Sequence, residues 1–523
     1  MDGFLIHSPI ARFAREAPER HAFRFAGECL TYRDLEMRSN QLAHALLERG
    51  LTRRARVGIY MRKGLDLGVA IYGILKAGGA FVPLDPFVPK ARLAFMLADC
   101  GIEHVVSTDD MLDPLSELEV SHRLCVLGPE GEHPFQAVRR GDIDAQPTSP
   151  PDVWITDQDL AYLMYTSGST GEPKGMMHTH RSSLAYARWG AQHVDLEPDD
   201  RVASHAPLHF DLSIFDFFST SQVGGTVVLV PEPVTKFPAS WTQTIEDERI
   251  SVVFTVPFTL IEMLERGAMD ARDLSSLRWI LFGGEPFPPK HLRALMNALP
   301  GARFTNVYGP AEAPSCTCFD VPGPPEDLAA PIPIGTVSSN SDDLVLDEEG
   351  AECEPGHPGE LCIRSTTLTS GYWNRPDLNE RVFLKRPGLG PFPEVYFRTG
   401  DLVVRRDDGL LEFLGRSDRM VKTRGHRVEL DDVEAALSSH PSVAESAAYV
   451  VPDGAGSSTI LASVTASAGA LLDSNEVQRH ARTRLPAYAV PRSIAVAKSL
   501  PRTSSGKIDR KALAESAAKR SDP

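Results

Sequence analysis

Apolar segments of strand length alternate with longer segments of helical spacing over most of the chain. The strand-like segments are residues 102–107, 226–230, 252–255 and 279–282. Residues 69–76 instead have the apolar pattern of a helix, which Gly78 and Gly79 are expected to end. Strands separated by helices form parallel sheets that carry helices on both faces. The expected fold class is therefore α/β, with mainly parallel sheets covered by helices.

The pattern changes near residue 395. Two strand-like segments, 401–406 and 410–414, flank an Asp-Asp-Gly turn and predict a β-hairpin. Beyond it, residues 429–437 are typical of a helix, 443–451 and 460–464 of strands, and Ser474 of the cap of a helix that ends near Arg484. A chain of 523 residues exceeds what one hydrophobic core usually holds. We therefore expect a large α/β domain followed by a small α+β domain.

The net charge excludes several classes of partner. Lys and Arg number 54 against 70 Asp and Glu, a formal charge of −16, whereas nucleic-acid binding requires a basic surface. No segment approaches the ~18 uninterrupted apolar residues of a membrane span, and the first residues lack the pattern of a secretion signal. Seven scattered cysteines have neither zinc nor redox spacing. We expect a cytoplasmic protein with no nucleic-acid or membrane partner.

Residues 165–175 read Tyr-Thr-Ser-Gly-Ser-Thr-Gly-Glu-Pro-Lys-Gly. Glycine permits backbone conformations that turn successive N–H groups toward anionic oxygens, while hydroxyls and a lysine add further donors. Gly-Lys-Ser/Thr is absent, so the segment is not a Walker A loop. It predicts a phosphate-binding loop made of Thr166, Ser167, Gly168, Ser169, Thr170, Gly171 and Lys174.

This loop resembles the signature loop of adenylate-forming enzymes, which include acyl- and aryl-CoA synthetases, luciferases and the adenylation domains of nonribosomal peptide synthesis. Other segments resemble further motifs of that family, in the same order along nearly the whole chain. They are residues 30–32, 76–86 (Lys-Ala-Gly-Gly-Ala-Phe-Val-Pro-Leu-Asp-Pro), 306–312 (Asn-Val-Tyr-Gly-Pro-Ala-Glu), 359–361, 371–372, 398–402 (Arg-Thr-Gly-Asp-Leu), 415–418 with Lys422, 425–430, and 501–509 (Pro-Arg-Thr-Ser-Ser-Gly-Lys-Ile-Asp). The resemblance implies a large domain over residues 1–417, a mobile small domain over 418–523, and a hinge at Asp418.

The resemblance also implies the reaction: a carboxylate attacks the α-phosphorus of ATP to give an acyl-adenylate and pyrophosphate. Lys507 and Lys174 are then the catalytic cations, and Glu312 is the carboxylate that holds Mg²⁺. Asp401 would accept the ribose hydroxyls. The other residues expected at the nucleotide are Gly283, Gly284, Glu285, Asn306, Tyr308, Gly309, Arg416 and Lys422.

One position departs from the family pattern. Ala311 stands where the family usually has threonine, so one hydroxyl contact to phosphate is lost. The remaining expected residues Lys174, Glu312, Asp401 and Lys507 are all present, and we therefore expect an active enzyme.

The segment His209-Phe210-Asp211-Leu212-Ser213 indicates the class of acid. Amino-acid-activating members of the family carry an aspartate at the place of Asp211, where it pairs with the ammonium group of the substrate. The same position would also suit an aspartate that caps a helix over 213–219. The remaining pocket positions implied by the resemblance are Leu212, Phe215, Thr255, Leu281, Gly283, Val307, Ser315 and Cys316. They carry no second charge, which favours a small or medium apolar amino acid such as proline, alanine or a β-amino acid.

The chain contains no carrier-attachment motif and no condensation motif, so we expect a free-standing ligase. Its acceptor would be the phosphopantetheine thiol of a separate carrier protein, which is acidic and would need a local basic patch on this acidic chain. The alternative is an acyl- or aryl-CoA synthetase, against which Asp211 and residues 76–86 argue. A third hypothesis, a non-catalytic helper subunit, has only Ala311 in its favour.

Overall fold

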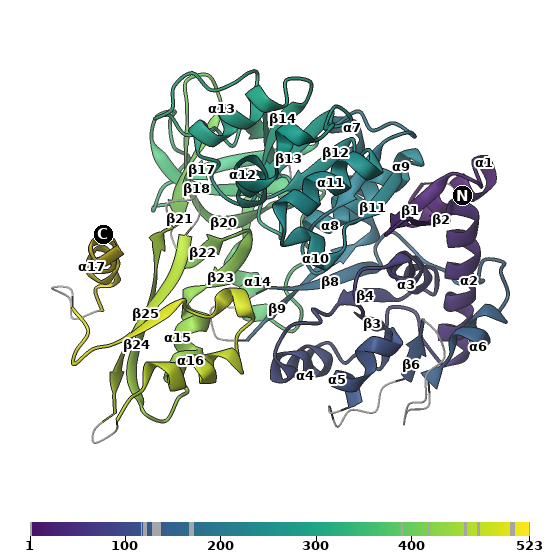
Figure 1. Ribbon diagram of the computed structural model, residues 1–523, viewed down its shortest axis with the longest axis horizontal. Helices are drawn as coiled ribbons and strands as arrows, with labels where there is room; N and C mark the ends of the chain where they lie inside the picture. Colours follow the sequence, from purple (N-terminus) through teal and green to yellow (C-terminus); the bar gives the residue numbers. More distant parts are fainter. Residues whose placement is uncertain are drawn as a thin grey trace.

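The computed structural model describes residues 3–116, 118, 123–127, 137–166, 172–388, 391–416, 419–453, 458–467, 471–502 and 508–521 (Figure 1). The chain forms two large sheets, a smaller antiparallel sheet and a C-terminal lobe, and its first two strands belong to the same large sheet as the strands from β10 to β16. The mixed α/β class expected from the sequence is confirmed, as is the small α+β region at the C-terminal end. Among the helices of the described residues, none is both long enough and apolar enough to cross a membrane.

The first large sheet is parallel except for the antiparallel pair β8–β9. Its seven strands, in spatial order, are β7 (Ala137–Val138), β6 (Arg123–Val126), β5 (His104–Ser107), β3 (Arg56–Tyr60), β4 (Ala80–Pro83), β8 (Leu160–Thr166) and β9 (Lys174–Thr179). The helices of this part are α2 (Tyr32–Glu48), α3 (Leu65–Lys76), α4 (Lys90–Asp99), α5 (Leu112–Ser116) and α6 (Arg140–Asp144). Helix α2 begins directly after Thr31, whose hydroxyl caps it by accepting a hydrogen bond from the Asp34 N–H at 3.1 Å.

The second large sheet has nine strands and is parallel from β1 to β14. In spatial order they are β16 (Thr336–Val337), β15 (Thr317–Asp320), β14 (Arg303–Tyr308), β13 (Trp279–Gly283), β12 (Val252–Thr255), β10 (Arg201–Ser204), β11 (Thr226–Leu229), β1 (His21–Phe25) and β2 (Glu28–Thr31). Its longer helices are α1 (Ser8–Glu16), α7 (His180–His193), α11 (Pro238–Glu248), α12 (Pro257–Arg266) and α13 (Pro289–Ala298).

A cluster of aromatic side chains joins the two large sheets. Phe23 of β1 and Phe81 of β4 lie on either side of Phe217 and Phe218, with ring centroids 5.5 Å apart for Phe23–Phe217 and 6.3 Å for Phe81–Phe218. Phe217 and Phe218 belong to a π-helical turn, η2 (Phe215–Ser219), between α8 (Leu212–Ile214) and α9 (Thr220–Val223). The aromatic packing of this turn fixes the position of the residues before it, including Asp211. π-Helical turns often occur at functional sites.

The antiparallel sheet connects the large sheets to the C-terminal lobe. Its strands are β17 (Ser341–Leu346), β18 (Pro358–Ser365), β20 (Pro393–Arg405), β19 (Phe383–Pro387) and β21 (Leu411–Arg416), with α14 (Pro376–Val382) before β19. The hairpin expected after residue 395 corresponds to β20 and β21, although β20 begins earlier than the sequence pattern suggests.

The C-terminal lobe has a hydrophobic core of its own, in which residues between Val428 and Ile494 pack together. It contains the hairpin β22 (Met420–Thr423) and β23 (His426–Glu429), the sheet β24 (Val443–Pro452), β25 (Ser458–Ala466) and β26 (Ser493–Val496), and helices α15 (Leu430–Ser438), α16 (Ser474–Arg482) and α17 (Arg510–Ser521). Asp473, and not Ser474, caps α16, with its carboxylate 2.9 Å from the Asn475 N–H. The expected hinge residue, Asp418, lies outside the described residues.

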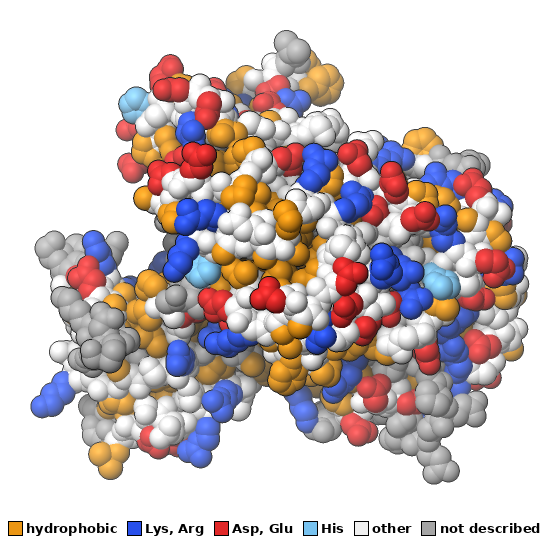
Figure 2. All heavy atoms as spheres, turned by 45° about the horizontal axis from the view of Figure 1, so that its top comes forward, with side chains coloured by type: hydrophobic (Ala, Val, Ile, Leu, Met, Phe, Trp, Pro, Cys, Tyr) orange, Lys and Arg blue, Asp and Glu red, His pale blue; other side chains and the backbone are white. Residues whose placement is uncertain are grey.

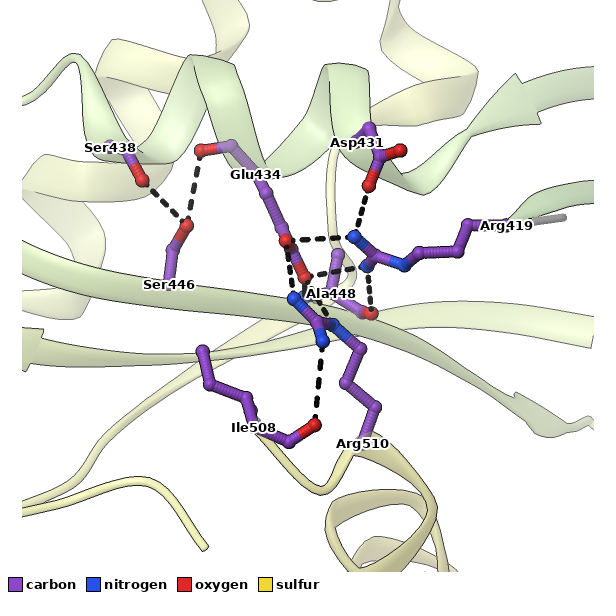
Figure 3. Close-up of polar contacts among 8 residues, drawn as sticks. All are labelled: Arg419, Asp431, Glu434, Ser438, Ser446, Ala448, Ile508 and Arg510. Atoms are coloured by element: carbon purple, nitrogen blue, oxygen red, sulfur yellow. Dashed lines mark hydrogen bonds and ion pairs between the residues drawn. The ribbon is translucent and has the colours of Figure 1, made fainter. Parts of the chain in front are cut away.

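Glu434 of α15 binds two arginines, one from near the start and one from near the end of the lobe's sequence (Figure 3). Arg419 donates to its two oxygens at 2.6 and 3.0 Å, and Arg510 of α17 does so at 2.8 and 2.9 Å. The Ala448 N–H of β24 donates to the same carboxylate at 2.7 Å. This one carboxylate therefore joins the start of the β22–β23 hairpin, the lobe's sheet and α17. In Figure 1, α17 lies on the side of that sheet away from the large domain.

Candidate active site

A cavity opens at the carboxyl ends of the parallel strands, which is where open α/β sheets place their ligands. The loops that follow β10, β13 and β14 supply Asp211, Gly284 and Gly309, and the β8–β9 hairpin supplies Thr166. Thr166, the last residue of β8, pairs with Lys174, the first residue of β9. Of the predicted phosphate loop, residues 167–171 lie outside the described residues. Of the two flanking residues, Thr166 lines the cavity and Lys174 pairs with it across the hairpin.

Glu312 is the most strongly paired acid of the site. Arg427 donates to its two carboxylate oxygens at 3.0 and 2.9 Å, and the Tyr372 hydroxyl donates to one of them. Burial by itself raises the pKa of Glu312, but Arg427 and Lys174 outweigh it and lower the pKa to about 2. Glu312 is therefore a buried carboxylate that is charged near neutral pH and has Arg427 beside it.

A carboxylate of this kind fits a magnesium ion carried in by a nucleotide. Mg²⁺ commonly takes one or two carboxylates and completes its shell with phosphate oxygens and water. No three His, Cys, Asp or Glu side chains gather as a metal site within the described part of the chain. Glu312 would therefore share the ion with the phosphates, once Arg427 has left the carboxylate.

Lys174 lies beside this pair. Its ammonium group is 3.6 Å from the Glu429 carboxylate and 5.3 Å from the centre of the Tyr372 ring. Burial and the neighbouring Arg427 lower the pKa of Lys174, and Glu429 and Glu312 oppose that shift. The two predicted large-domain residues Lys174 and Glu312 are thus brought together, with small-domain residues between them and solvent.

Asp401, which is expected to bind the ribose, lines the cavity. It is buried, and its two oxygens accept hydrogen bonds from the Tyr308 hydroxyl and the Arg416 guanidinium. Asn306 instead donates to the Pro333 carbonyl at 2.8 Å. Asp401 and Arg416 line the cavity, whereas Asn306 and Tyr308 stand behind its wall on β14. Of the residues expected at the nucleotide, the glycines Gly283, Gly284 and Gly309 therefore line the cavity, whereas Asn306 and Tyr308 do not.

Gly284 follows β13 with a φ of +91°, a conformation that favours glycine. A Cβ on the preceding Gly283 would lie 2.2 Å from the Val307 carbonyl oxygen, so only glycine fits between β13 and β14. Glu285 accepts a hydrogen bond from the Gly425 N–H of the small domain at 2.5 Å. Glu285 thus contacts the small domain in this arrangement.

Asp211 occupies the N-cap position of α8 but makes no capping hydrogen bond with its side chain. Its carboxylate lines the cavity together with Leu212, Gly283, Val307 and Ser315. Burial raises the pKa of Asp211, while Lys422 acts in the opposite direction. An acid that is open to the cavity and costly to leave unpaired is suited to bind an ammonium group.

The other predicted pocket residues are less directly placed. Phe215, Leu281 and Cys316 are almost completely buried behind the wall, and Thr255 lines a neighbouring groove. The large-domain part of the cavity wall includes two aromatic residues that the sequence did not indicate, Tyr186 of α7 and Phe254 of β12. Both fall in ordinary apolar positions of a helix and a strand, so no sequence signal distinguishes them from core residues.

The β22–β23 hairpin of the small domain covers the cavity. Arg427 and Lys422 reach into it, and Gly425 approaches Val256 so closely that a Cβ would lie 2.8 Å from a Val256 methyl group. Burial lowers the pKa of Lys422, and Asp401 acts against this shift. The motif over residues 425–430 was visible in the sequence, but the contact of Arg427 with Glu312 was not.

A groove of about 590 Å³ runs from this cavity between the two domains. Its walls are mainly apolar, from large-domain residues such as Leu84, Phe87 and Phe258 and small-domain residues such as Ala487. The groove and the cavity share the residues His209, Phe210, Leu212, Val256, Gly425 and Tyr488. Figure 2 shows hydrophobic side chains gathered on the central face, with Lys, Arg, Asp and Glu side chains around them. The groove therefore connects the outside to the predicted reaction centre.

We expect Ala311→Thr to leave the fold intact and to leave adenylation unchanged or faster, by up to about tenfold, the effect of one net hydrogen bond. Ala311 lines the cavity, and its carbonyl accepts a hydrogen bond from His178 at 3.2 Å, a contact that the substitution keeps. ATP–pyrophosphate exchange measures the rate. A large loss would mean that the surroundings are packed around alanine and leave no room for a hydroxyl.

Comparison with known proteins adds independent information. A family model described as "AMP-binding enzyme" matches residues 10–373, and one described as "AMP-binding enzyme C-terminal domain" matches residues 432–507. An L-proline--[L-prolyl-carrier protein] ligase of Pseudomonas fluorescens is 35% identical over 98% of this chain and 99% of its own length. A protein of the same description from Streptomyces coelicolor is 35% identical over 96% of each chain.

Solved structures of similar proteins share the architecture. The amide bond synthetase McbA from Marinactinospora thermotolerans superposes with a TM-score of 0.84, at 26% identity over 97% of this chain and 99% of its own. Holo-PA1221, a nonribosomal peptide synthetase protein with adenylation and carrier (PCP) domains, gives 0.81 at 25% identity, covering 97% of this chain and 84% of its own. The likeness extends over both the large domain and the C-terminal lobe.

Proposed function

The chain belongs to the AMP-binding enzyme family, and from that premise we propose that it activates an amino acid as its aminoacyl-adenylate and transfers it to a carrier-protein thiol. The observation that carries the proposal is a cavity lined by the carboxylates of Asp211 and Asp401 and by Arg427, which binds the buried Glu312 next to Lys174. The two similar ligases named for L-proline and its carrier protein support the same reaction.

In the first half-reaction the substrate carboxylate attacks the α-phosphorus of ATP and pyrophosphate leaves. Two anions must meet, so cations and oriented donors carry the catalysis. Lys174 and the Mg²⁺ held at Glu312 would offset the phosphate charge, and Asp401 would bind the ribose. Lys507, outside the described residues, is proposed as the cation that bridges the two reactants.

The substrate class follows from the charges of the pocket. Asp211 provides one acidic partner for an ammonium group, while Leu212, Val307, Tyr186 and Phe254 form an apolar wall. A charged substrate side chain would be buried there without a partner. A small or medium apolar amino acid, of the proline or alanine kind or a β-amino acid, fits this pocket.

In the second half-reaction a thiol attacks the adenylate carbonyl and AMP leaves. We interpret the present arrangement as the one for this step, because the β22–β23 hairpin covers the cavity while the groove beside it is open. Arg510, three residues beyond Lys507, is bound to Glu434 (Figure 3). Its helix, α17, lies on the side of the lobe's sheet away from the large domain (Figure 1). Rotation of residues 418–523 about Asp418 would exchange these two faces, as hinged domains do.

ATP–pyrophosphate exchange with a panel of proteinogenic amino acids, β-amino acids, aryl acids and fatty acids tests the first half-reaction. Exchange with apolar amino acids alone supports the proposal, and exchange with aryl or fatty acids alone would favour a CoA synthetase. Transfer is then compared between phosphopantetheinylated carrier proteins and free CoA. If free CoA is as good an acceptor as any carrier, carrier loading is wrong. If no acid supports exchange, the helper-subunit hypothesis replaces both.

Asp211→Asn is expected to raise the KM for the amino acid and lower kcat/KM by about 30-fold or more, since losing one partner of a buried charge pair costs roughly 2–5 kcal/mol. The KM for ATP should change little, because Asp211 lies at the amino-acid end of the cavity. The des-amino analogue of the substrate is the matched control. If wild-type enzyme activates that analogue as well as the amino acid, Asp211 does not bind an ammonium group.

A further inference from the structure

His209 stands at the point where the groove enters the cavity. It belongs to the loop between β10 and α8 and lines both spaces, with 18% of its side chain exposed. Its ring contacts the Phe210 ring edge to face, with centroids 5.3 Å apart. A group arriving through the groove must pass this imidazole before it reaches the cavity.

Asp85 lies behind that imidazole. It follows β4 and is buried, and its Oδ2 is 3.6 Å from His209 Nε2. Its other oxygen, Oδ1, accepts a hydrogen bond from the Phe87 N–H at 2.9 Å, which fixes the carboxylate. An aspartate on one imidazole nitrogen sets the tautomer and stabilises the protonated ring, leaving the other nitrogen, Nδ1, to accept a proton. Such contacts are often loose before substrate binds and shorten in the complex.

We propose that His209, oriented by Asp85, is the general base that takes the proton from the acceptor thiol. This assignment rests on the proposed carrier loading. The thiol S–H proton passes to His209 Nδ1, and the sulfur attacks the adenylate carbonyl. The carbonyl carbon then loses its bond to the phosphate oxygen, and AMP leaves. The imidazolium is stabilised by Asp85 and returns its proton to solvent through the groove. His209 is thus a catalytic residue and Asp85 a positioning residue.

A base is useful here because an ordinary thiol is mostly protonated near neutral pH, whereas the thiolate is the nucleophile. The charges around His209 suit that role. Burial lowers its pKa, Asp85 opposes the shift, and Lys63 adds to it. From the small domain, His426 also faces it, and burial lowers the pKa of His426 to about 4. His209 is therefore neutral, and able to accept a proton, down to a pH below the ordinary histidine value of about 6.5.

The test measures single-turnover transfer from preformed aminoacyl-adenylate to the phosphopantetheinylated carrier between pH 5.5 and 9.5. We expect His209→Gln to slow transfer about 10²–10³-fold near neutral pH, the usual contribution of a general base. Its rate should rise with pH as the thiol ionises, whereas wild type levels off. In Asp85→Asn, His209 loses the charge that raises its pKa, so the acidic limb should move to lower pH, with a loss of about tenfold.

Two readouts separate a base from a structural residue. Pyrophosphate exchange, which involves no thiol, should fall at least about tenfold less than transfer in both variants, and a melting temperature close to that of wild type shows that they are folded. N-acetylselenocysteamine, whose selenol is already ionised, should restore transfer in His209→Gln where N-acetylcysteamine does not. An unchanged rate and pH profile in His209→Gln, or equal losses with the selenol and the thiol, would overturn the assignment. Absence of transfer by wild type would instead overturn carrier loading, and the base with it.

Discussion

Replacing Arg427 by methionine is expected to slow transfer of the aminoacyl group to the carrier by about 10²-fold or more, and to leave adenylate formation within about threefold of wild type. Arg427 is the cation that pairs with the buried carboxylate of Glu312 when the hairpin covers the cavity. Removing one partner of a buried ion pair leaves the other charge uncompensated, which costs about 3–5 kcal/mol. In adenylation, Mg²⁺ is proposed to take over Glu312, so that step does not need Arg427.

A double-mutant cycle makes this prediction specific. Transfer is measured from chemically supplied aminoacyl-adenylate, so that Glu312→Gln can be assayed even if it no longer makes adenylate. If Arg427 acts through Glu312, Arg427→Met should cost much less in the Glu312→Gln background than in wild type. An equal cost in both backgrounds, or an equal loss of adenylation, would contradict the assigned role. Arg427→Lys, which keeps the charge but not the paired contact, should fall between wild type and Arg427→Met.

Lys507→Ala is expected to have the opposite profile. Adenylate formation should fall by about 10²–10³-fold, the scale for removal of one preorganised donor to developing charge. Transfer from supplied aminoacyl-adenylate should remain within a few-fold of wild type, because in that step the hairpin carrying Arg427 faces the cavity. Pyrophosphate exchange and single-turnover thioester formation measure the two steps separately.

Lys511→Ala is the matched control, since Lys511 is an exposed lysine on α17 four residues further along the chain. It should leave both half-reactions unchanged. If Lys507→Ala reduces both half-reactions equally, Lys507 is not a residue that serves adenylation alone. If Lys511→Ala has the same effect as Lys507→Ala, the loss reflects the general positive charge of this end of the chain.

Regular elements could be predicted where the apolar spacing was unambiguous. Residues 252–255 form β12 as expected, and the helix expected over 69–76 forms α3, beginning one turn earlier at Leu65. The predicted capping residue of α16, Ser474, was wrong. Asp473 and Ser474 are both good capping residues, and only the packing of the chain selects Asp473. The register of β20 and its early start also depend on pairing with β19, which the sequence does not encode locally.

In the site, too, residues within short motifs could be predicted, whereas contacts between distant parts of the chain could not. Asp211, Glu312 and Asp401 could be proposed as site residues because each lies within a short motif that resembles one of the family. Arg427 was missed because its role exists only through contact with Glu312, 115 residues away and on another domain. The pairing of His209 with Asp85 likewise joins two loops that follow different strands of different sheets. Residue type and spacing indicate what a side chain can do, whereas its partner across domains requires the assembled fold.

The shared carboxylate of Glu434 has a consequence for the timing of turnover. Since it binds Arg419, Arg510 and the Ala448 N–H together, the hairpin, the sheet and α17 are expected to turn as one piece. Any rotation that carries Arg510 toward the cavity must carry the hairpin away from it. If the proposed function is correct, adenylation and thiol transfer would then exclude each other in time, and the small domain would have to rotate between them. If these parts of the small domain moved independently, water could reach the adenylate between the two half-reactions. Variants that weaken the contacts of Glu434 should therefore release AMP without forming the thioester.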